Sequence, residues 1–135
     1  MWALRNAKLR TARKLLFASG LLPLLLCHRL RKDEIRPFLI DQFRTPPTDR
    51  IAYAFLLAGA IDPGTRALGA YDRWLGMLDD PDVRGRLQDL RREDAKRSPV
   101  FQEVRRLADE IEGGLLALLF DTTPLRHLVR EYGIF

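Results

Sequence analysis

The chain has 135 residues, of which 47% are hydrophobic and 30% are charged. This composition excludes an intrinsically disordered or collagen-like chain and is typical of a globular domain. A chain of this length is expected to fold as one domain, here residues 1–135, and to bury about two-thirds of its unfolded surface. Cys27 is the only cysteine, which excludes an intrachain disulfide and fits a cytoplasmic location.

The formal net charge of +5 is unevenly distributed. Residues 1–32 hold eight basic side chains and no acidic one, whereas residues 33–135 hold the other 15 bases and all 18 acids. The first segment therefore carries a charge of +8 and the second a charge of −3. Such a split favours contact of the basic segment with an acidic protein face, a lipid head group or a phosphate.

Residues 1–32 predict a basic helical hairpin. The apolar spacing indicates a helix over 2–19, which Gly20 ends, and a second helix from Pro23 to about Arg31. The uncharged run 15–27 is shorter than the roughly 20 residues of a spanning helix. A basic lead before this run imitates a secretory signal, but residues 28–32 offer no small-residue cleavage site. We expect a buried hairpin, and a hairpin seated in a membrane interface stays open as the alternative.

The remaining residues, 33–135, predict a helical body. Asp33 is expected to begin a helix with Ile35, Phe38, Leu39 and Phe43 facing inward, and apolar spacing indicates further helices over 49–60, 63–79, 81–96, 99–120 and 124–132. A short polar side chain caps free amides, and a proline at the first helical position loses no hydrogen bond. Four such pairs predict helix starts: Asp62-Pro63, Asp80-Pro81, Ser98-Pro99 and Thr123-Pro124.

The predicted fold is therefore all-α, a single compact bundle of about seven to eight short helices, with the N-terminal hairpin at one end. Alternation with period two, which would indicate strands, is absent. The Gly113-Gly114 pair inside helix 99–120 indicates a kink or close packing by another helix. Trp74 and the segment 132–135 are the exposed apolar candidates, with the segment expected to dock onto the domain or a neighbour.

Motifs that would carry chemistry are weak in this sequence. The cluster of Asp79, Asp80 and Asp82 is explained by helix capping and the helix dipole, because a metal site usually needs oxygens from separated elements. His28 and His127 lack the spacing of zinc ligands, and Cys27 and His28 point about 100° apart on one helix. We expect no cofactor and no metal. A small enzyme with a site between helices 63–79 and 99–120 stays as a third hypothesis.

The basic segment is the main candidate contact surface. An acidic protein partner or a second copy of the chain is the first expectation, and an anionic membrane at its cytoplasmic face is the second. Nucleic acid comes third, because neither a helix-turn-helix pattern nor stacking aromatic residues accompany the charge. The sequence thus predicts a non-enzymatic interaction or regulatory domain. Its candidate residues are Trp2, Arg5, Lys8, Arg10, Arg13, Lys14, Arg29, Arg31 and Lys32.

Overall fold

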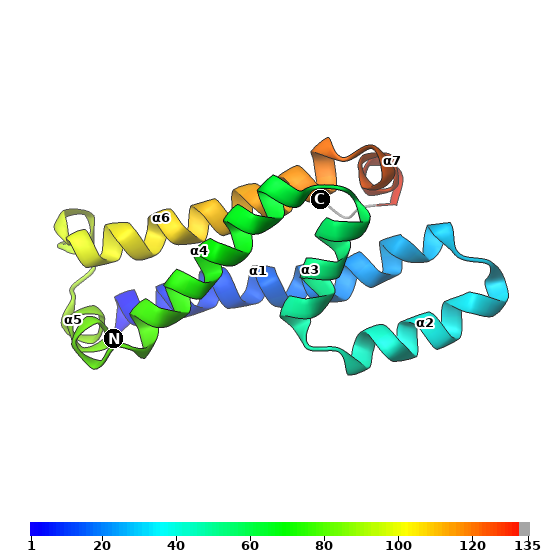
Figure 1. Ribbon diagram of the computed structural model, residues 1–135. Coiled ribbons are helices and arrows are strands. Elements are labelled where there is room, and N and C mark those ends of the chain that lie inside the picture. Colours follow the sequence, from blue (N-terminus) through cyan, green and yellow to red (C-terminus); the bar gives the residue numbers. More distant parts are fainter. Residues whose placement is uncertain (133–135) are drawn as a thin grey trace.

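A computed structural model describes residues 1–132, apart from the side chain of Pro124. These residues form seven α-helices and no strand, which confirms the predicted all-α bundle (Figure 1). The expectations for residues 133–135 lie outside the described residues. The helices are α1 (Trp2–Leu26), α2 (Lys32–Arg44), α3 (Pro47–Leu57), α4 (Ile61–Asp79), α5 (Pro81–Asp89), α6 (Pro99–Leu116) and α7 (Thr123–Tyr132). Short 3₁₀ turns at Cys27–Arg29 and Ala95–Arg97 and a π-helical turn at Ala117–Asp121 complete the element order.

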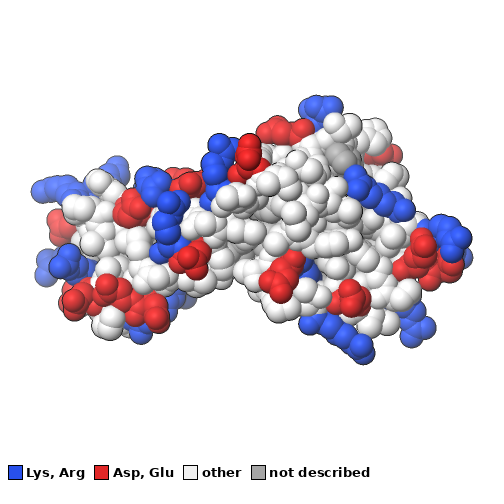
Figure 2. Space-filling model, in the orientation of Figure 1, with Lys and Arg blue, Asp and Glu red and all other residues white. Residues whose placement is uncertain are grey.

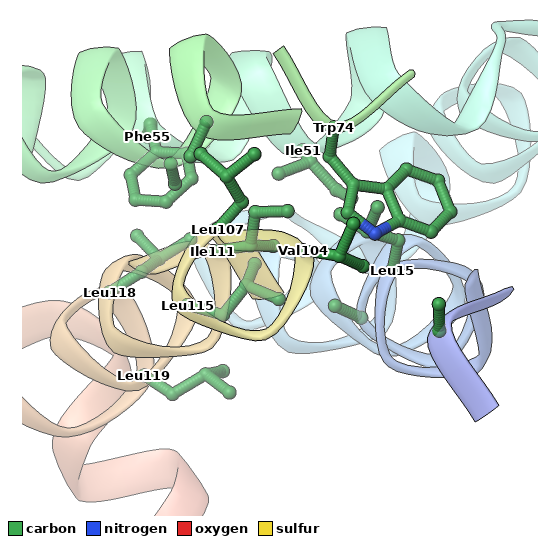
Figure 3. Packing of buried hydrophobic residues seen from close by; sticks show 14 of the residues in the cluster. Leu15, Ile51, Phe55, Trp74, Val104, Leu107, Ile111, Leu115, Leu118 and Leu119 are labelled. Atoms are coloured by element: carbon green, nitrogen blue, oxygen red, sulfur yellow. The ribbon is translucent and has the colours of Figure 1, made fainter. Parts of the chain in front are cut away.

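The helices pack around one apolar core. Helices α4 and α6 lie side by side and share the most extensive interface, while α1 packs along both α6 and α3 (Figure 1). The buried side chains meet between these four helices, with Trp74 at one side of the cluster (Figure 3). The cluster includes Leu15 of α1, Ile51 and Phe55 of α3, and Val104, Leu107, Ile111 and Leu115 of α6.

Two of the four predicted capped-proline starts are confirmed. The carboxylate of Asp80 accepts hydrogen bonds from the amides of Asp82 (2.8 Å) and Val83 (3.2 Å) at the start of α5. The hydroxyl of Ser98 accepts from the Phe101 amide (3.3 Å) at the start of α6. The other two starts are wrong by one or two residues, because α4 begins at Ile61 and α7 at Thr123. Pro63 and Pro124 still fall in a first turn, where a missing N–H removes no helical bond.

The predicted hairpin turn at Gly20–Pro23 is wrong, because α1 continues unbroken to Leu26. Pro23 has no N–H, so the carbonyl of Ser19, one turn earlier, lacks its helical donor. Nη1 of Arg50, from α3, donates to that carbonyl at 3.1 Å and replaces the missing bond. The chain reverses instead between Cys27 and Arg31, so the N-terminal pair of antiparallel helices is α1 and α2 (Figure 1).

Helix α2 is less buried than its sequence predicts. Gln42 is the one residue of α2 that is buried, Ile35, Phe38 and Leu39 are half-buried, and Phe43 is 49% exposed, so the inward placement of Phe43 is wrong. Helix α2 begins at Lys32 rather than at Asp33, and Pro37 lies in the helix interior. Helix α2 is little buried because it contacts the rest of the molecule mainly through α1, over a small interface.

Several helix ends also differ from prediction. The helix expected over 81–96 ends at Asp89, and that expected over 99–120 passes into the π-helical turn after Leu116. Helix α3 begins at Pro47 and ends at Leu57. Gly59 follows it with φ of 71°, and the amides of Gly59 and Ala60 bond back to the carbonyls of Leu56 (3.1 Å) and Phe55 (2.9 Å). This arrangement is the Schellman end, which requires a residue in the left-handed region.

Two further expectations concern single side chains of α4 and α6. A Cβ on Gly114 would lie 2.5 Å from the Cβ of Ala67, which confirms close packing of α6 on α4 as the reason for a glycine there. Trp74 is only 3% exposed and stacks on Tyr71 with 5.8 Å between ring centroids, so its expected exposure is wrong.

Candidate interaction surface

The nine candidate residues do not form one continuous patch. Six of them lie on α1 between Trp2 and Lys14, Arg29 lies in the 3₁₀ turn, and Arg31 and Lys32 lie at the start of α2. An α-helix rises 1.5 Å per residue, so about 22 Å of uncharged chain separates Lys14 from Arg29. The structure therefore divides the basic segment into a cluster at each end of α1.

Three of the candidate cations are neutralised within the chain. Arg10 pairs with Asp109 of α6 at 3.1 Å, and Lys14 forms an ion pair with Glu112 of the same helix. Arg31 contacts the carboxylates of Asp33 (3.0 Å) and Glu34 (3.8 Å) at the start of α2. Such exposed pairs contribute little to stability, but they remove these charges from the available surface.

The other cations of α1 stay available. Arg5, Lys8 and Arg13 have no acidic partner within 4 Å among residues 1–132. Trp2 is 39% exposed and is partly engaged in packing, because its ring lies 5.6 Å from that of Phe101 and the guanidinium of Arg92 lies 5.7 Å from its centroid.

The available cations share a helix face with exposed leucines. Side chains spaced by three or four residues lie on one face of a helix. Arg5, Leu9, Arg13 and Leu16 follow this spacing, and Leu24 lies eight residues, about two turns, beyond Leu16 on the same side. We call these five residues the outward face of α1. Leu9, Leu16 and Leu24 are 37%, 65% and 54% exposed. The opposite face packs into the core through Leu4, Thr11, Leu15, Leu22 and Leu26.

The outward face of α1 contains no acidic residue, because α1 itself has none. The face of the molecule formed by α3 and α4 is different. There, acidic and basic side chains are mixed around a wide uncharged area over α3 and the start of α4 (Figure 2). A face that combines apolar and basic side chains without acidic ones is therefore a property of α1 rather than of the domain as a whole.

The hollow at the site expected for the enzyme hypothesis is small, and the carboxylate of its Glu110 is already ion-paired. The hollow between α4 and α6 measures about 240 Å³ and is lined by Arg66 and Glu110 among others. Glu110 contacts Arg73 at 3.3 Å and Arg106 at 3.0 Å. Arg106 also donates to Glu103, and this bond lowers the pKa of Glu103 and raises that of Arg106. Glu103 is therefore held as a carboxylate and is unsuited to donating a proton at neutral pH.

A larger hollow lies elsewhere, between α1, α4 and α5. It measures about 710 Å³ and brings together Lys8, Asp72, Asp79 and Arg84. The guanidinium of Arg84 is held by two hydrogen bonds to the carbonyl of Leu78 (3.1 and 2.9 Å). Polar groups from three helices thus meet at a place that sequence reasoning missed, and the enzyme hypothesis stays a prediction.

The chain's cysteine and histidines gather near the end of α1. The thiol of Cys27 donates to the carbonyl of Pro23 (3.3 Å), and burial raises its pKa, which disfavours the reactive thiolate. His28 and His127 line one common hollow, a juxtaposition that sequence spacing did not reveal. In the described part of the chain, no group of three or more His, Cys, Asp or Glu residues could hold a metal. Within the same residues, no helix is long and apolar enough to cross a membrane.

Comparison of the chain with protein-family models, with curated proteins and with solved structures gives no match.

Proposed function

We propose that the protein is a non-enzymatic helical binding module that contacts the acidic surface of a partner protein through the outward face of α1. The observation that carries the proposal is the combination on one face of exposed leucines with arginines that have no acidic partner in the described chain. Lys8, beside this face, adds a third free cation.

The two kinds of side chain have different parts in the contact. Burial of Leu9, Leu16 and Leu24 against a partner supplies affinity, at roughly 25 cal/mol for each Å² of apolar surface removed from water. Arg5 and Arg13 select the partner, because like charges repel and acidic ones accelerate the encounter. From Arg5 to Leu24 the face is about 28 Å long, the length of about five helical turns, which suits a partner that docks lengthwise.

Site-specific photo-crosslinking in the cells that make the protein tests this proposal. A photoreactive residue replaces Leu9 or Leu16, and in a matched control it replaces Gln102, an exposed residue of α6. We expect a discrete protein adduct from positions 9 and 16 only. Mass spectrometry should identify the crosslinked protein and the crosslinked segment, and the structure of that protein should show an acidic surface there. The double change Arg5→Gln and Arg13→Gln should reduce this adduct at least tenfold, whereas Arg105→Gln with Arg126→Gln, on α6 and α7, should not.

The proposal is overturned if positions 9 and 16 give no more adduct than position 102. It is also overturned if the adduct forms equally well without the two arginines, or if the crosslinked species is nucleic acid.

An anionic membrane surface is the second candidate. The observation that favours it is the uncharged run 15–27, along which Leu16, Phe17 and Leu24 are exposed. Because α1 is continuous, the run would lie along the interface as a helix edge rather than dip into it as a hairpin. Flotation with vesicles of phosphatidylglycerol and phosphatidylcholine, at low and high salt, decides this candidate. Binding at low salt that Leu16→Gln with Leu24→Gln abolishes would support it, and no flotation would exclude it.

A further inference from the structure

A half-open hollow of about 540 Å³ lies between the end of α1 and α7. Its walls come from three elements that are distant in sequence: the last turn of α1, the 3₁₀ turn Cys27–Arg29, and the first half of α7. The volume falls within the range of about 300–1,000 Å³ that is usual for small-molecule sites. The outward face of α1 does not contribute to it, so the hollow is a separate feature of the molecule.

The rim of the hollow gathers basic groups. Both histidines of the chain, His28 and His127, line it together with Arg29, and Thr123 adds a hydroxyl. No acidic side chain among the described residues lines it. Arg29 is oriented by a long hydrogen bond from its Nη1 to the carbonyl of Leu57 (3.5 Å), and its other donors have no partner within residues 1–132. The carboxylate of Glu131 lies beside the rim, with its Oε2 3.4 Å from Nε2 of His127.

The floor of the hollow is apolar. It is built from Leu25 and Leu26 of α1 and from Leu125 and Leu128 of α7. Leu26, Leu125 and Leu128 are buried in the domain, so they form a fixed wall rather than a mobile surface. An apolar floor beneath a few convergent polar groups is the usual composition of a ligand site.

We propose that this hollow binds a small amphipathic carboxylate, with its head group on Arg29, His28 and His127 and its apolar chain against the four leucines. An arginine fork matches the two oxygens of a carboxylate, and a bond between charged partners is about twice as strong as a neutral one. The leucines bury the chain, which distinguishes such a ligand from a small inorganic anion. The site is distinct from the proposed contact through α1, since none of the five residues of the outward face lines the hollow.

Titration with octanoate tests the assignment, followed by calorimetry and by amide shifts in ¹⁵N-labelled protein. We expect binding with shifts centred on residues 25–29 and 123–128. Acetate, which has the head group without the chain, and octanol, which has the chain without the charge, should each bind at least tenfold more weakly. Arg29→Gln should weaken octanoate binding about tenfold or more, because it removes the charged fork. Arg130→Gln, an exposed arginine of α7 outside the hollow, is the matched control and should have no effect.

Substitution tests the part of the histidines. The double change His28→Ala and His127→Ala removes both imidazoles from the lining of the hollow and should weaken octanoate binding severalfold, because their ring nitrogens no longer bond the head group.

The proposal is overturned if octanoate does not bind at millimolar concentration, or if octanol binds as well as octanoate. It is also overturned if Arg29→Gln has no effect on affinity in a variant whose thermal unfolding matches that of the unaltered protein. None of these results bears on crosslinking through α1, so each proposal fails on its own evidence.

Discussion

Two adjacent glycines of α6 have opposite surroundings. A Cβ on Gly114 would lie 2.5 Å from the Cβ of Ala67 and 2.9 Å from the carbonyl oxygen of Pro63, whereas a Cβ on Gly113 would meet nothing within 4 Å. Both positions are helical, so alanine would gain the same helix propensity at each, about 1 kcal/mol over glycine. Only at position 114 does the added methyl group force α6 away from α4.

Gly113→Ala should therefore stabilise the protein by about 1 kcal/mol. Gly114→Ala should destabilise it by about 1–3 kcal/mol, because the Pro63 carbonyl is backbone and cannot move without the whole of α4. Urea unfolding of the two variants measures both changes. Equal effects of the two substitutions would show that α6 and α4 are not packed this closely.

Cys27 allows a prediction about reactivity. Burial raises the pKa of its thiol, so at any given pH near 8 its thiolate fraction is smaller than that of an unhindered cysteine. Alkylation by iodoacetamide at pH 8 should be slower in the folded protein than in the protein unfolded in urea, and its rate should keep rising above pH 9. An alkylation rate in the folded protein equal to that in urea would contradict the assigned burial.

At the scale of elements, local signals identified two of the four capped-proline helix starts, those of α5 and α6. The caps at Asp80 and Ser98 depend on side chains that bond amides two or three residues ahead, so the sequence alone predicts them. The path of α1 through Pro23 depends instead on Arg50, which comes from a different helix. No window of sequence around Pro23 contains that donor, which is why the prediction of a turn was wrong there.

The compensation between Pro23 and Arg50 predicts an energetic coupling. Arg50→Gln should cost about 1–2 kcal/mol in the natural sequence, because the Ser19 carbonyl loses a charged donor. In a Pro23→Ala background the restored amide bonds this carbonyl, so the same change should cost less, with a coupling of about 1 kcal/mol.

Urea unfolding of the four proteins gives this double-mutant cycle. A second cycle, Pro23→Ala with Phe43→Leu, is the control. Phe43 also contacts Arg50, whose guanidinium lies 5.2 Å from its ring centroid, but it takes no part in the carbonyl bond. A coupling below about 0.3 kcal/mol between positions 23 and 50 would mean that the bond does not compensate for the proline.

At the scale of the whole molecule, the sequence identified the basic segment. It did not show which cations of that segment are paired with acidic side chains of other helices. The absence of acids before Asp33 is visible in the sequence itself. The pairing of Arg10 and Lys14 with α6 was not predictable, because their acidic partners are almost 100 residues away and meet them only once α1 docks beside α6. The hollow that joins His28 and His127 depends in the same way on tertiary packing.

The uneven burial of the helices predicts uneven stability. Helix α2 has Gln42 as its one buried residue, and the Oε1 of this residue has no hydrogen-bond partner among the described residues. Helix α3, of similar length, buries Ile51, Ala54 and Phe55. Segments with few buried apolar contacts open locally at a free energy well below that of global unfolding.

Native-state hydrogen exchange measures this difference helix by helix. The amides of α2 should exchange at least tenfold faster than those of α3, and those in the middle of α6, which buries seven residues, should be the slowest of the three. Arg50→Gln should accelerate exchange in α2 further, since it removes the contact with Phe43, and should leave the order of α3 and α6 unchanged. If the amides of α2 are as protected as those of α6, α2 opens only with the whole domain. That result would contradict the expectation that this sparsely packed helix opens locally.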